Sequence, residues 1–228
     1  MKKLIDCINE KLILSKNRDN IDFVDLGLPS GTLWAVTNIG AEEPWKYGDY
    51  FAWGEVVPRK NFKFKDYKFF KDGSYTKYNE TDGKTVLDIV NDAAHKHCIS
   101  DSCLPTPEQC EELITNVKYK WVEKYKDRRV YGFLFTANNG NELFIPAAGY
   151  YGTFGLDEIG EYFIIPTNTL KTENGSSEYF ITFTNANGIN GFSKNKIEKG
   201  GLSRYCGSAI RPVKRVKAQP VNTNELKF

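Results

Sequence analysis

Residues 23–35 read FVDLGLPSGTLWA, and residues 47–55 read YGDYFAWGE. Both stretches are short apolar runs that end at Gly or Pro, a pattern typical of β-strands joined by tight turns. Trp34 and Trp53 are side chains large enough to anchor a hydrophobic core. Neither stretch contains a nucleophile–base pair or a metal-ligand spacing. They therefore predict a scaffold, and function must be sought in the segments around it.

The composition favours one strand-rich domain with long loops. Of the 228 residues, 14% are aromatic, and the chain contains 19 Gly and 9 Pro. Aromatic residues favour strands, whereas Gly and Pro favour turns. The sequence therefore predicts an α+β domain over residues 21–215, with a flexible tail at 216–228.

The charge and hydropathy patterns argue against two classes of partner. The 31 basic residues nearly balance the 29 acidic ones, so the chain lacks the positive field of a general nucleic-acid binder. No apolar stretch approaches the roughly 20 residues that a membrane helix needs. We expect no nucleic-acid partner and no membrane span.

The cysteines form an odd set without a C-x-x-C pair or a matching histidine spacing, so we expect no zinc site. They are Cys7, Cys98, Cys103, Cys110 and Cys206. Free thiols are the favoured interpretation; the alternative is a Cys98–Cys103 bridge, which would need an oxidising compartment.

The start of the chain superficially resembles a bacterial lipoprotein, but polar residues interrupt the apolar run of about 7–15 residues that a signal peptide needs. We expect a protein made in the cytoplasm without a signal peptide.

Residues 1–14 predict an amphipathic helix, and the polar residues 15–20 predict a linker after it. The apolar side of the helix is formed by Leu4, Ile5, Ile8, Leu12 and Ile13. Either the helix packs back on its own domain, or it docks this apolar side into a groove on a larger partner. It needs a surface in both cases, because an isolated helix of this length is marginally stable in water.

Two segments could bind a ligand but favour a structural interpretation. Residues 59–71 interleave Lys with Phe and Tyr. Such a stretch could stack on single-stranded nucleic acid, or it could be an edge strand with lysines on its exposed face, which is the interpretation we favour. His95 and His97 are the only histidines and follow a predicted turn in a short helix. No third ligand is placed by spacing, so we expect a structural or solvated role for them.

The middle of the chain gives the clearest local signals. Thr106, Pro107 and Gln109 predict a capped helix that runs to about residue 116 and buries Cys110. Further along we expect strands at 119–125, 130–137, 142–146 and 179–185, with a hairpin turn at 138–141. Residues 147–152 predict a loop, and residues 184–193 and 194–203 predict long exposed loops. Residues 204–213 predict a closing strand.

Several of these segments, taken in their order along the chain, resemble the sequence of a known domain family. The stretches concerned are residues 23–35 and 47–55, Lys84–Asp88, Asp92–Ala94, Leu104–Thr106, Ile145–Tyr150 and Ala209–Val213. Together they resemble the paralogous domain found in many copies in Bacteroidetes and Fibrobacter surface proteins, a branch of the C-type-lectin-like fold. The resemblance implies a twisted antiparallel sheet with one or two helices and long loops.

The chain also departs from that family. Ser102-Cys103 replaces the usual Trp-Arg, and residues 162–165 replace the usual Tyr-Trp-Ser-Ser element. The calcium-dependent sugar motifs of true C-type lectins are absent, so we expect no calcium-dependent sugar chemistry. The same fold hosts formylglycine-generating enzymes, but Cys206 lacks the nearby partner cysteine that those enzymes use.

The fold also hosts the variable proteins of diversity-generating retroelements, which display residues late in the domain. Residues that we expect in such a late, ligand-facing stretch are Asn185, Asn187, Asn190, Asn195, Arg204 and Tyr205. The resemblance to these display proteins predicts a binding or display protein with no catalytic residue, cofactor or metal. Its expected ligand is a glycan or protein on a host surface.

Residues 8–17 are similar to the short leaders on structural proteins of crAss-like bacteriophages, which infect Bacteroidetes. That similarity implies a virion protein, such as a head fibre, capsid decoration or tail adhesin, docked to a capsid or other virion protein by residues 1–20. We expect a homo-oligomer, as is common for such assemblies. The alternatives are a bacterial surface or interaction protein of the same fold and, as a third reading, an enzyme of the formylglycine-generating type.

Overall fold

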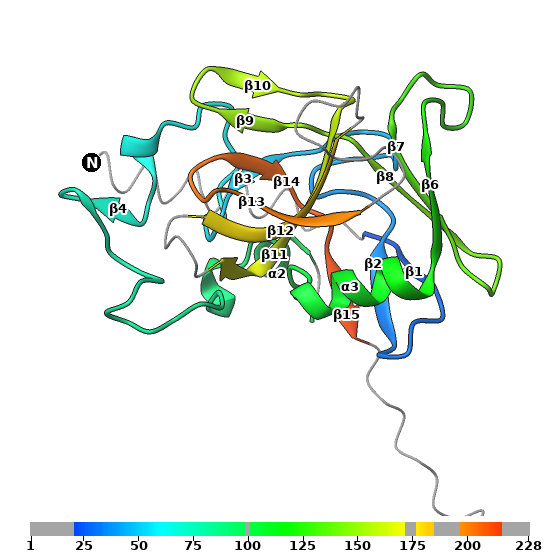
Figure 1. Ribbon diagram of the computed structural model, residues 1–228, viewed down its shortest axis with the longest axis horizontal. Helices are drawn as coiled ribbons and strands as arrows, with labels where there is room; N and C mark the ends of the chain where they lie inside the picture. Colours follow the sequence, from blue (N-terminus) through cyan, green and yellow to red (C-terminus); the bar gives the residue numbers. More distant parts are fainter. Residues whose placement is uncertain (1–20, 99–100, 172–176, 185–196, 216–228) are drawn as a thin grey trace, which may run out of the picture.

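The computed structural model describes residues 21–98, 101–171, 177–184 and 197–215, and Figure 1 shows their arrangement. The predicted N-terminal helix and C-terminal tail lie outside these residues. Within them the α-helices are α2 (Ala93–His97) and α3 (Pro107–Asn116), and the 3₁₀ helices are η1 (Phe64–Asp66) and η2 (Ile89–Asn91). The strands are β1 (Phe23–Asp25), β2 (Thr32–Ala35), β3 (Tyr50–Ala52), β4 (Phe70–Lys71), β5 (Ser74–Tyr75), β6 (Lys118–Val122), β7 (Gly132–Thr136), β8 (Glu142–Pro146), β9 (Tyr150–Gly152), β10 (Gly155–Asp157), β11 (Tyr162–Lys171), β12 (Ser177–Thr184), β13 (Glu198–Ser203), β14 (Gly207–Ala209) and β15 (Val213–Arg215).

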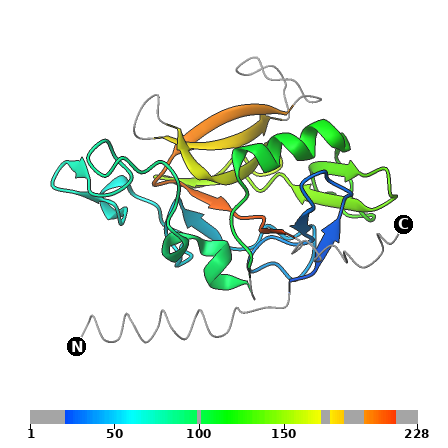
Figure 2. The same cartoon turned by 90° about the horizontal axis from the view of Figure 1, so that it is seen from below.

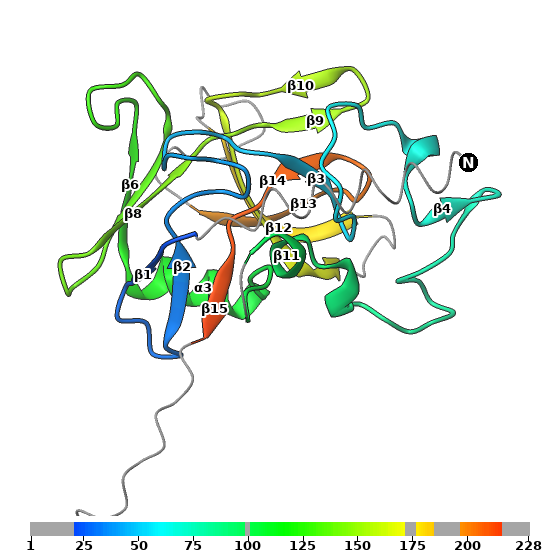
Figure 3. The ribbon, with the colours of Figure 1, turned by 180° about the vertical axis from the view of Figure 1, so that it is seen from behind.

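The described strands pair antiparallel throughout, which confirms an α+β architecture rich in antiparallel sheet. The sheets have the strand orders β1-β2-β15, β10-β9-β14-β3, β11-β12-β13, β6-β7-β8 and β4-β5. The β4-β5 segment and the β6-β7-β8 sheet lie at opposite ends of the molecule, as Figures 1 and 3 show. The β9-β10 pair runs along one edge.

The opening stretch builds the first sheet. A hydrogen bond from Gly31 N to Leu28 O closes the turn between β1 and β2, and Gly31 takes a φ of +70°, which favours glycine. β2 then pairs on its other side with β15, so Trp34 lies between a residue of β1 and one of β15. The two ends of the domain are therefore joined through β2.

Trp34 and Trp53 anchor two separate parts of the core, as the sequence predicts. Trp34 is fully buried in a cluster with side chains of α3, β7, β8 and β11. Trp53 is buried in a second cluster, and its indole Nε1 donates to Thr167 O at 3.0 Å. Indole N–H groups usually find such a partner when they are buried.

Helix α3 confirms the predicted capping box. Thr106 Oγ1 accepts from Gln109 N at 3.2 Å, and Gln109 Oε1 accepts from Thr106 N at 2.9 Å. The helix lies beside the β11-β12-β13 sheet, as Figure 2 shows. Its inner side buries Cys110, whose free thiol has a pKa raised by burial. Cys110 is therefore a core residue.

The interpretation of residues 59–71 as an edge strand is wrong. A strand would place Phe62 and Phe64 on one face, but Phe62 is fully buried and Phe64 is 39% exposed. The segment instead turns through η1, because Phe62, Tyr67 and Phe69 all enter the second core cluster. Only its last two residues form a strand, the short β4.

Other predictions for the late part of the chain need smaller corrections. The expected loop at 194–203 contains β13, and the expected closing strand at 204–213 is divided between β14 and β15. Likewise, the expected loop at 147–152 ends in β9. The predicted turn at 138–141 is confirmed as the connection of the β7–β8 hairpin.

His97 has the expected structural role. Its ring is fully buried, with Nε2 at 2.7 Å from Val56 O and its plane edge-on to Phe51. Helix α2 carries it there, capped by the Asp92 side chain, which accepts from His95 N at 3.1 Å. The histidine thus packs β3 against α2.

Candidate functional site

The β9–β10 hairpin projects an aromatic side chain into solvent. Its strands pair Gly152 with Gly155, so that Thr153 and Phe154 form the turn between them. Gly155 takes a φ of +122°, a value that side-chain-bearing residues rarely adopt. Phe154 is fully exposed at the tip. A single exposed apolar side chain is common on protein surfaces, but aromatic side chains are enriched among the residues that dominate binding, so we take the tip as a candidate contact point.

The pleat of the hairpin directs its side chains to two sides. Tyr150 lies opposite Asp157 in the strand register, and Tyr151 lies opposite Leu156. Since neighbouring residues of a strand face opposite sides, the Tyr150–Asp157 pair and the Tyr151–Leu156 pair face apart. Each pair borders a pocket.

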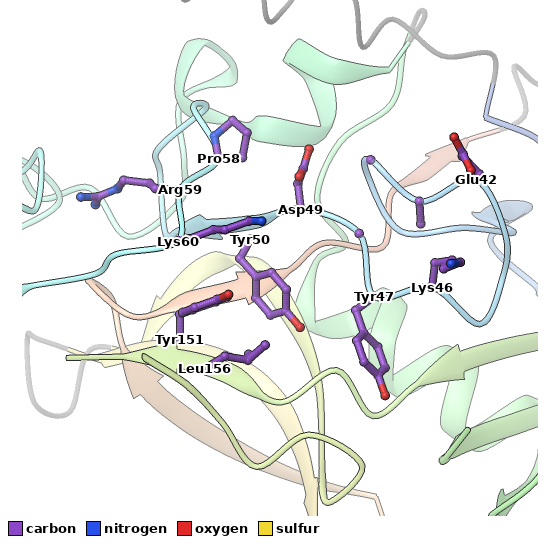
Figure 4. A pocket seen from close by; sticks show the side chains of 13 residues that line it. Glu42, Lys46, Tyr47, Asp49, Tyr50, Pro58, Arg59, Lys60, Tyr151 and Leu156 are labelled. Carbon is purple, nitrogen blue, oxygen red and sulfur yellow. The ribbon is translucent and has the colours of Figure 1, made fainter. Parts of the chain in front are cut away.

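The first pocket, called here the β3 pocket, has a volume of about 470 Å³. It lies between the hairpin, β3 and the loops before and after β3, and Figure 4 shows the side chains around it. Its lining residues are Gly40, Ala41, Glu42, Lys46, Tyr47, Gly48, Asp49, Tyr50, Pro58, Arg59, Lys60, Tyr151 and Leu156. This size and this mixture of aromatic and polar groups suit a small ligand or part of a larger one.

Two tyrosines form the aromatic wall of the β3 pocket. The rings of Tyr50 and Tyr151 meet edge to face with centroids 4.9 Å apart. The Tyr50 hydroxyl donates to Ala148 O at 2.6 Å, which fixes the ring against the connection between β8 and the hairpin. The wall is therefore set by the fold before any ligand arrives.

Charged groups of both signs lie around the same pocket. Burial raises the pKa of the Asp49 carboxyl, an effect that His97 and Lys60 partly offset. Arg59 forms an ion pair with Glu55 at 2.7 Å and lies over the Phe62 ring. The β3 pocket thus has no single dominant charge.

The second pocket, called here the tip pocket, lies on the other side of the hairpin and has a volume of about 500 Å³. It is lined by Tyr150, Gly152, Thr153, Phe154, Gly155, Leu156, Asp157, Leu202, Ser203, Tyr205 and Cys206. Its lining includes three aromatic side chains and the paired glycines Gly152 and Gly155.

Of the predicted ligand-facing residues, Tyr205 lines a pocket, whereas Arg204 lies in the interior. Tyr205 lines the tip pocket and packs edge-on against Phe64. The expectation that Arg204 is exposed is wrong: its side chain is fully buried. Asn185, Asn187, Asn190 and Asn195 lie outside the described residues, as do Leu4, Ile5, Ile8, Leu12 and Ile13 of the predicted docking helix.

Arg204 is buried because Tyr75 of β5 and the two carbonyls of residues 77–78 satisfy its guanidinium. Its guanidinium donates to Lys77 O at 2.8 Å and to Tyr78 O at 3.0 Å, and it lies 3.8 Å above the Tyr75 ring. Cation–π and carbonyl contacts together replace the water that a guanidinium would otherwise keep. Arg204 therefore ties the late chain to residues 75–78.

The described residues contain no group of three or more His, Cys, Asp or Glu side chains placed to hold a metal ion. In the same part of the chain, no helix is long and apolar enough to cross a membrane. Neither the family models, nor the curated proteins, nor the solved structures include a match to this chain.

Sequence reasoning missed the hairpin and both pockets. The available signal was the pattern Tyr-Tyr-Gly-Thr-Phe-Gly at 150–155, in which two glycines flank a two-residue turn. The β3 pocket had no comparable signal, because its walls come from residues 40–60 and from β9 and β10, about one hundred residues apart in sequence.

The buried tyrosines around the site predict alkaline sensitivity. Burial raises the pKa of Tyr50, and it also raises the pKa of Tyr47 and Tyr150. A pKa that is higher in the folded than in the unfolded state stabilises the fold below the unfolded value of about 10, and this stabilisation is lost as pH rises through the folded value. We expect the urea midpoint to fall above about pH 10. The Tyr50→Phe variant should show a shallower fall, and an identical pH profile in the variant would contradict this assignment.

Proposed function

We propose that this chain is a non-enzymatic binding and display protein with a C-type-lectin-like domain, which presents the β9–β10 hairpin to a surface glycan or protein of a host cell. The observation that carries the proposal is the fully exposed Phe154, at the tip of a hairpin whose strands border two pockets of several hundred Å³. The antiparallel sheets with few helices are compatible with this fold. The resemblance of residues 23–55 and of Ala209–Val213 supplies the fold assignment.

The geometry favours binding over chemistry. The rims of the pockets are formed largely by aromatic rings, glycines and scattered charges, which suit recognition by contact area and shape. Cys206 lines the tip pocket but is buried behind its neighbours. The nucleophile expected of a formylglycine-generating enzyme would need an accessible thiol.

We further propose that the protein is a virion component, docked to a capsid or other virion protein through residues 1–20. Support comes from the amphipathic pattern of these residues and from their similarity to leaders of crAss-like phage proteins. A homo-oligomer would repeat the hairpin around a symmetry axis and add avidity to a weak single contact. The alternative is a bacterial surface or interaction protein of the same fold.

Deleting residues 2–16 tests the proposed anchor. We expect the variant to keep a folded domain but to be lost from purified particles. Mass spectrometry of particles, with immunogold imaging of the wild-type protein, measures incorporation; the unfolding midpoint of the purified variant is the control. Normal incorporation of the deletion variant would exclude the anchor. Wild-type protein found on bacterial envelopes and missing from particles would favour the alternative.

A further inference from the structure

The lining of the tip pocket has a distinct charge character. Among its described lining residues Asp157 is the only one with a formal charge, and Lys and Arg are missing from them. The β3 pocket, in contrast, is lined by Lys46, Arg59 and Lys60 as well as two carboxylates. The two sides of one hairpin therefore offer different chemistry.

Three aromatic side chains from three segments line the tip pocket. Tyr150 comes from β9, Phe154 from the turn, and Tyr205 from the connection between β13 and β14. Tyr150 is backed by the Tyr162 ring at 6.0 Å, and Tyr205 is backed by Phe64 at 5.4 Å. These contacts hold the rings of Tyr150 and Tyr205 in place, whereas Phe154 stands exposed at the turn.

Asp157 is an exposed carboxylate beside the Tyr150 ring. It lies directly opposite Tyr150 in the strand register, which places the two side chains on the same face of the hairpin. Its Oδ1 accepts from Glu158 N at 2.9 Å, and within the described residues its Oδ2 has no hydrogen-bond donor. The pKa of Tyr150 is raised by burial and then by Asp157, which agrees with a negative local potential.

Arg204, the sequence neighbour of Tyr205, does not contribute a positive charge to the lining of the tip pocket. The guanidinium of Arg204 is committed to Tyr75 and to the carbonyls of Lys77 and Tyr78, and Arg204 does not line the pocket among the described residues. Gly152 and Gly155, which line the tip pocket, lie opposite each other in the strand register and carry no side chains. A Cβ on Gly152 would lie 3.5 Å from the Tyr150 ring, in the space that a ligand would use.

We propose that the tip pocket binds an organic ammonium group, held by the faces of Tyr150, Phe154 and Tyr205 and by the carboxylate of Asp157. Aromatic rings attract cations through their electron-rich faces, and a carboxylate adds a direct charge contact. The inference rests on the proposed function, because it names the chemistry that the displayed hairpin recognises. A quaternary ammonium and a lysine side chain are the two sources of this chemistry.

The test uses the ¹⁵N-labelled full chain and three probes: choline, Nα-acetyl-lysine methylamide, and 3,3-dimethylbutan-1-ol, the neutral isostere of choline. Amide shifts of Gly152, Gly155 and Cys206 report binding. We expect choline or the lysine probe to bind at least roughly fivefold more tightly than the neutral alcohol. The tighter of the two cations identifies the source.

Variants separate charge from shape. Asp157→Asn should weaken cation binding by roughly threefold to tenfold, whereas the matched control Asp72→Asn, at an exposed carboxylate of the β4–β5 turn, should leave it unchanged. Gly152→Val should abolish binding by filling space in the tip pocket, and valine suits a strand at this position. A dispersed amide spectrum would show that the valine variant is folded.

Two outcomes would overturn the inference: equal binding of choline and its neutral isostere, or no amide shift with either cation at concentrations on the order of 50 mM. Neither outcome would affect the proposed function, which is tested by particle incorporation and by cell binding. A protein that binds cells through Phe154 yet ignores both cations would refute only the ligand assignment.

Discussion

Replacing Arg211 by methionine is expected to lower the free energy of unfolding by about 2–4 kcal/mol. The Arg211 side chain is buried, and its guanidinium donates to Asn38 Oδ1 at 2.8 Å, to Ala35 O at 3.0 Å and to Phe144 O at 3.3 Å. It therefore joins β2, the loop that follows β2, and β8. Methionine fills similar space but leaves these three acceptors without the guanidinium, and that loss exceeds the relief of no longer burying a charge.

Urea unfolding monitored by tryptophan fluorescence measures this effect. Arg211→Lys should recover only part of the loss, because an ammonium cannot reproduce the planar fork that reaches three acceptors at once. The matched control is Arg129→Met at an exposed arginine, which should change the free energy of unfolding by less than about 0.5 kcal/mol. Equal stabilities of the Arg211 and Arg129 variants would contradict the assigned role.

Replacing Arg204 by methionine should cost a similar amount, about 2–4 kcal/mol. Its loss would remove two hydrogen bonds to the 77–78 backbone and the stacking on Tyr75, and so release the β4-β5 segment from the late chain. We also expect faster trypsin cleavage after Lys63, Lys65 or Lys71, which lie exposed in or beside that segment.

The neighbouring residue supplies the control for Arg204. Tyr205 is half-buried at the tip pocket and packs edge-on against Phe64, so Tyr205→Ala should cost less than about 1.5 kcal/mol and speed the cleavage less than Arg204→Met does. If Tyr205→Ala lowered the free energy of unfolding more than Arg204→Met does, the assignment of Arg204 as structural and of Tyr205 as a surface residue would be refuted.

The parts of the fold that the sequence predicted correctly are those with local causes. The capping box of Thr106 and Gln109 acts within one turn of helix, and the turn at 138–141 joins strands that are adjacent in sequence. Trp34 and Trp53 were identified as core anchors because few environments other than a core bury so large a side chain.

The failures have long-range causes. Arg204 stands in a Gly- and Lys-rich stretch that is typical of an exposed loop, but its partners lie 126 and 127 residues earlier in the chain. The alternation of Phe and Lys at 62–65 has the period of a strand, but the second core cluster takes Phe62, Tyr67 and Phe69 instead. Side-chain burial there overrides the local pattern.

The candidate site was predictable only in part for the same reason. Tyr205 was identified from its late position, and it does line a pocket. Tyr150, Phe154 and Asp157 were missed because their role depends on which way a short hairpin faces relative to the β13–β14 connection. That orientation is set by the pairing of Gly207 with Tyr151 and with Ala52, contacts between residues far apart in sequence.

Binding of the fluorescently labelled full chain to a panel of Bacteroidetes cells tests the central claim that the hairpin is the recognition surface. The comparison is between Phe154→Ser and the matched control Ile89→Ser, which removes another exposed apolar side chain, in η2. We expect the wild-type protein to bind at least one strain, Phe154→Ser to bind it at least roughly fivefold more weakly, and Ile89→Ser to bind it as the wild type does. Equal binding by both variants, or no binding of the wild-type protein to any strain, would contradict the account.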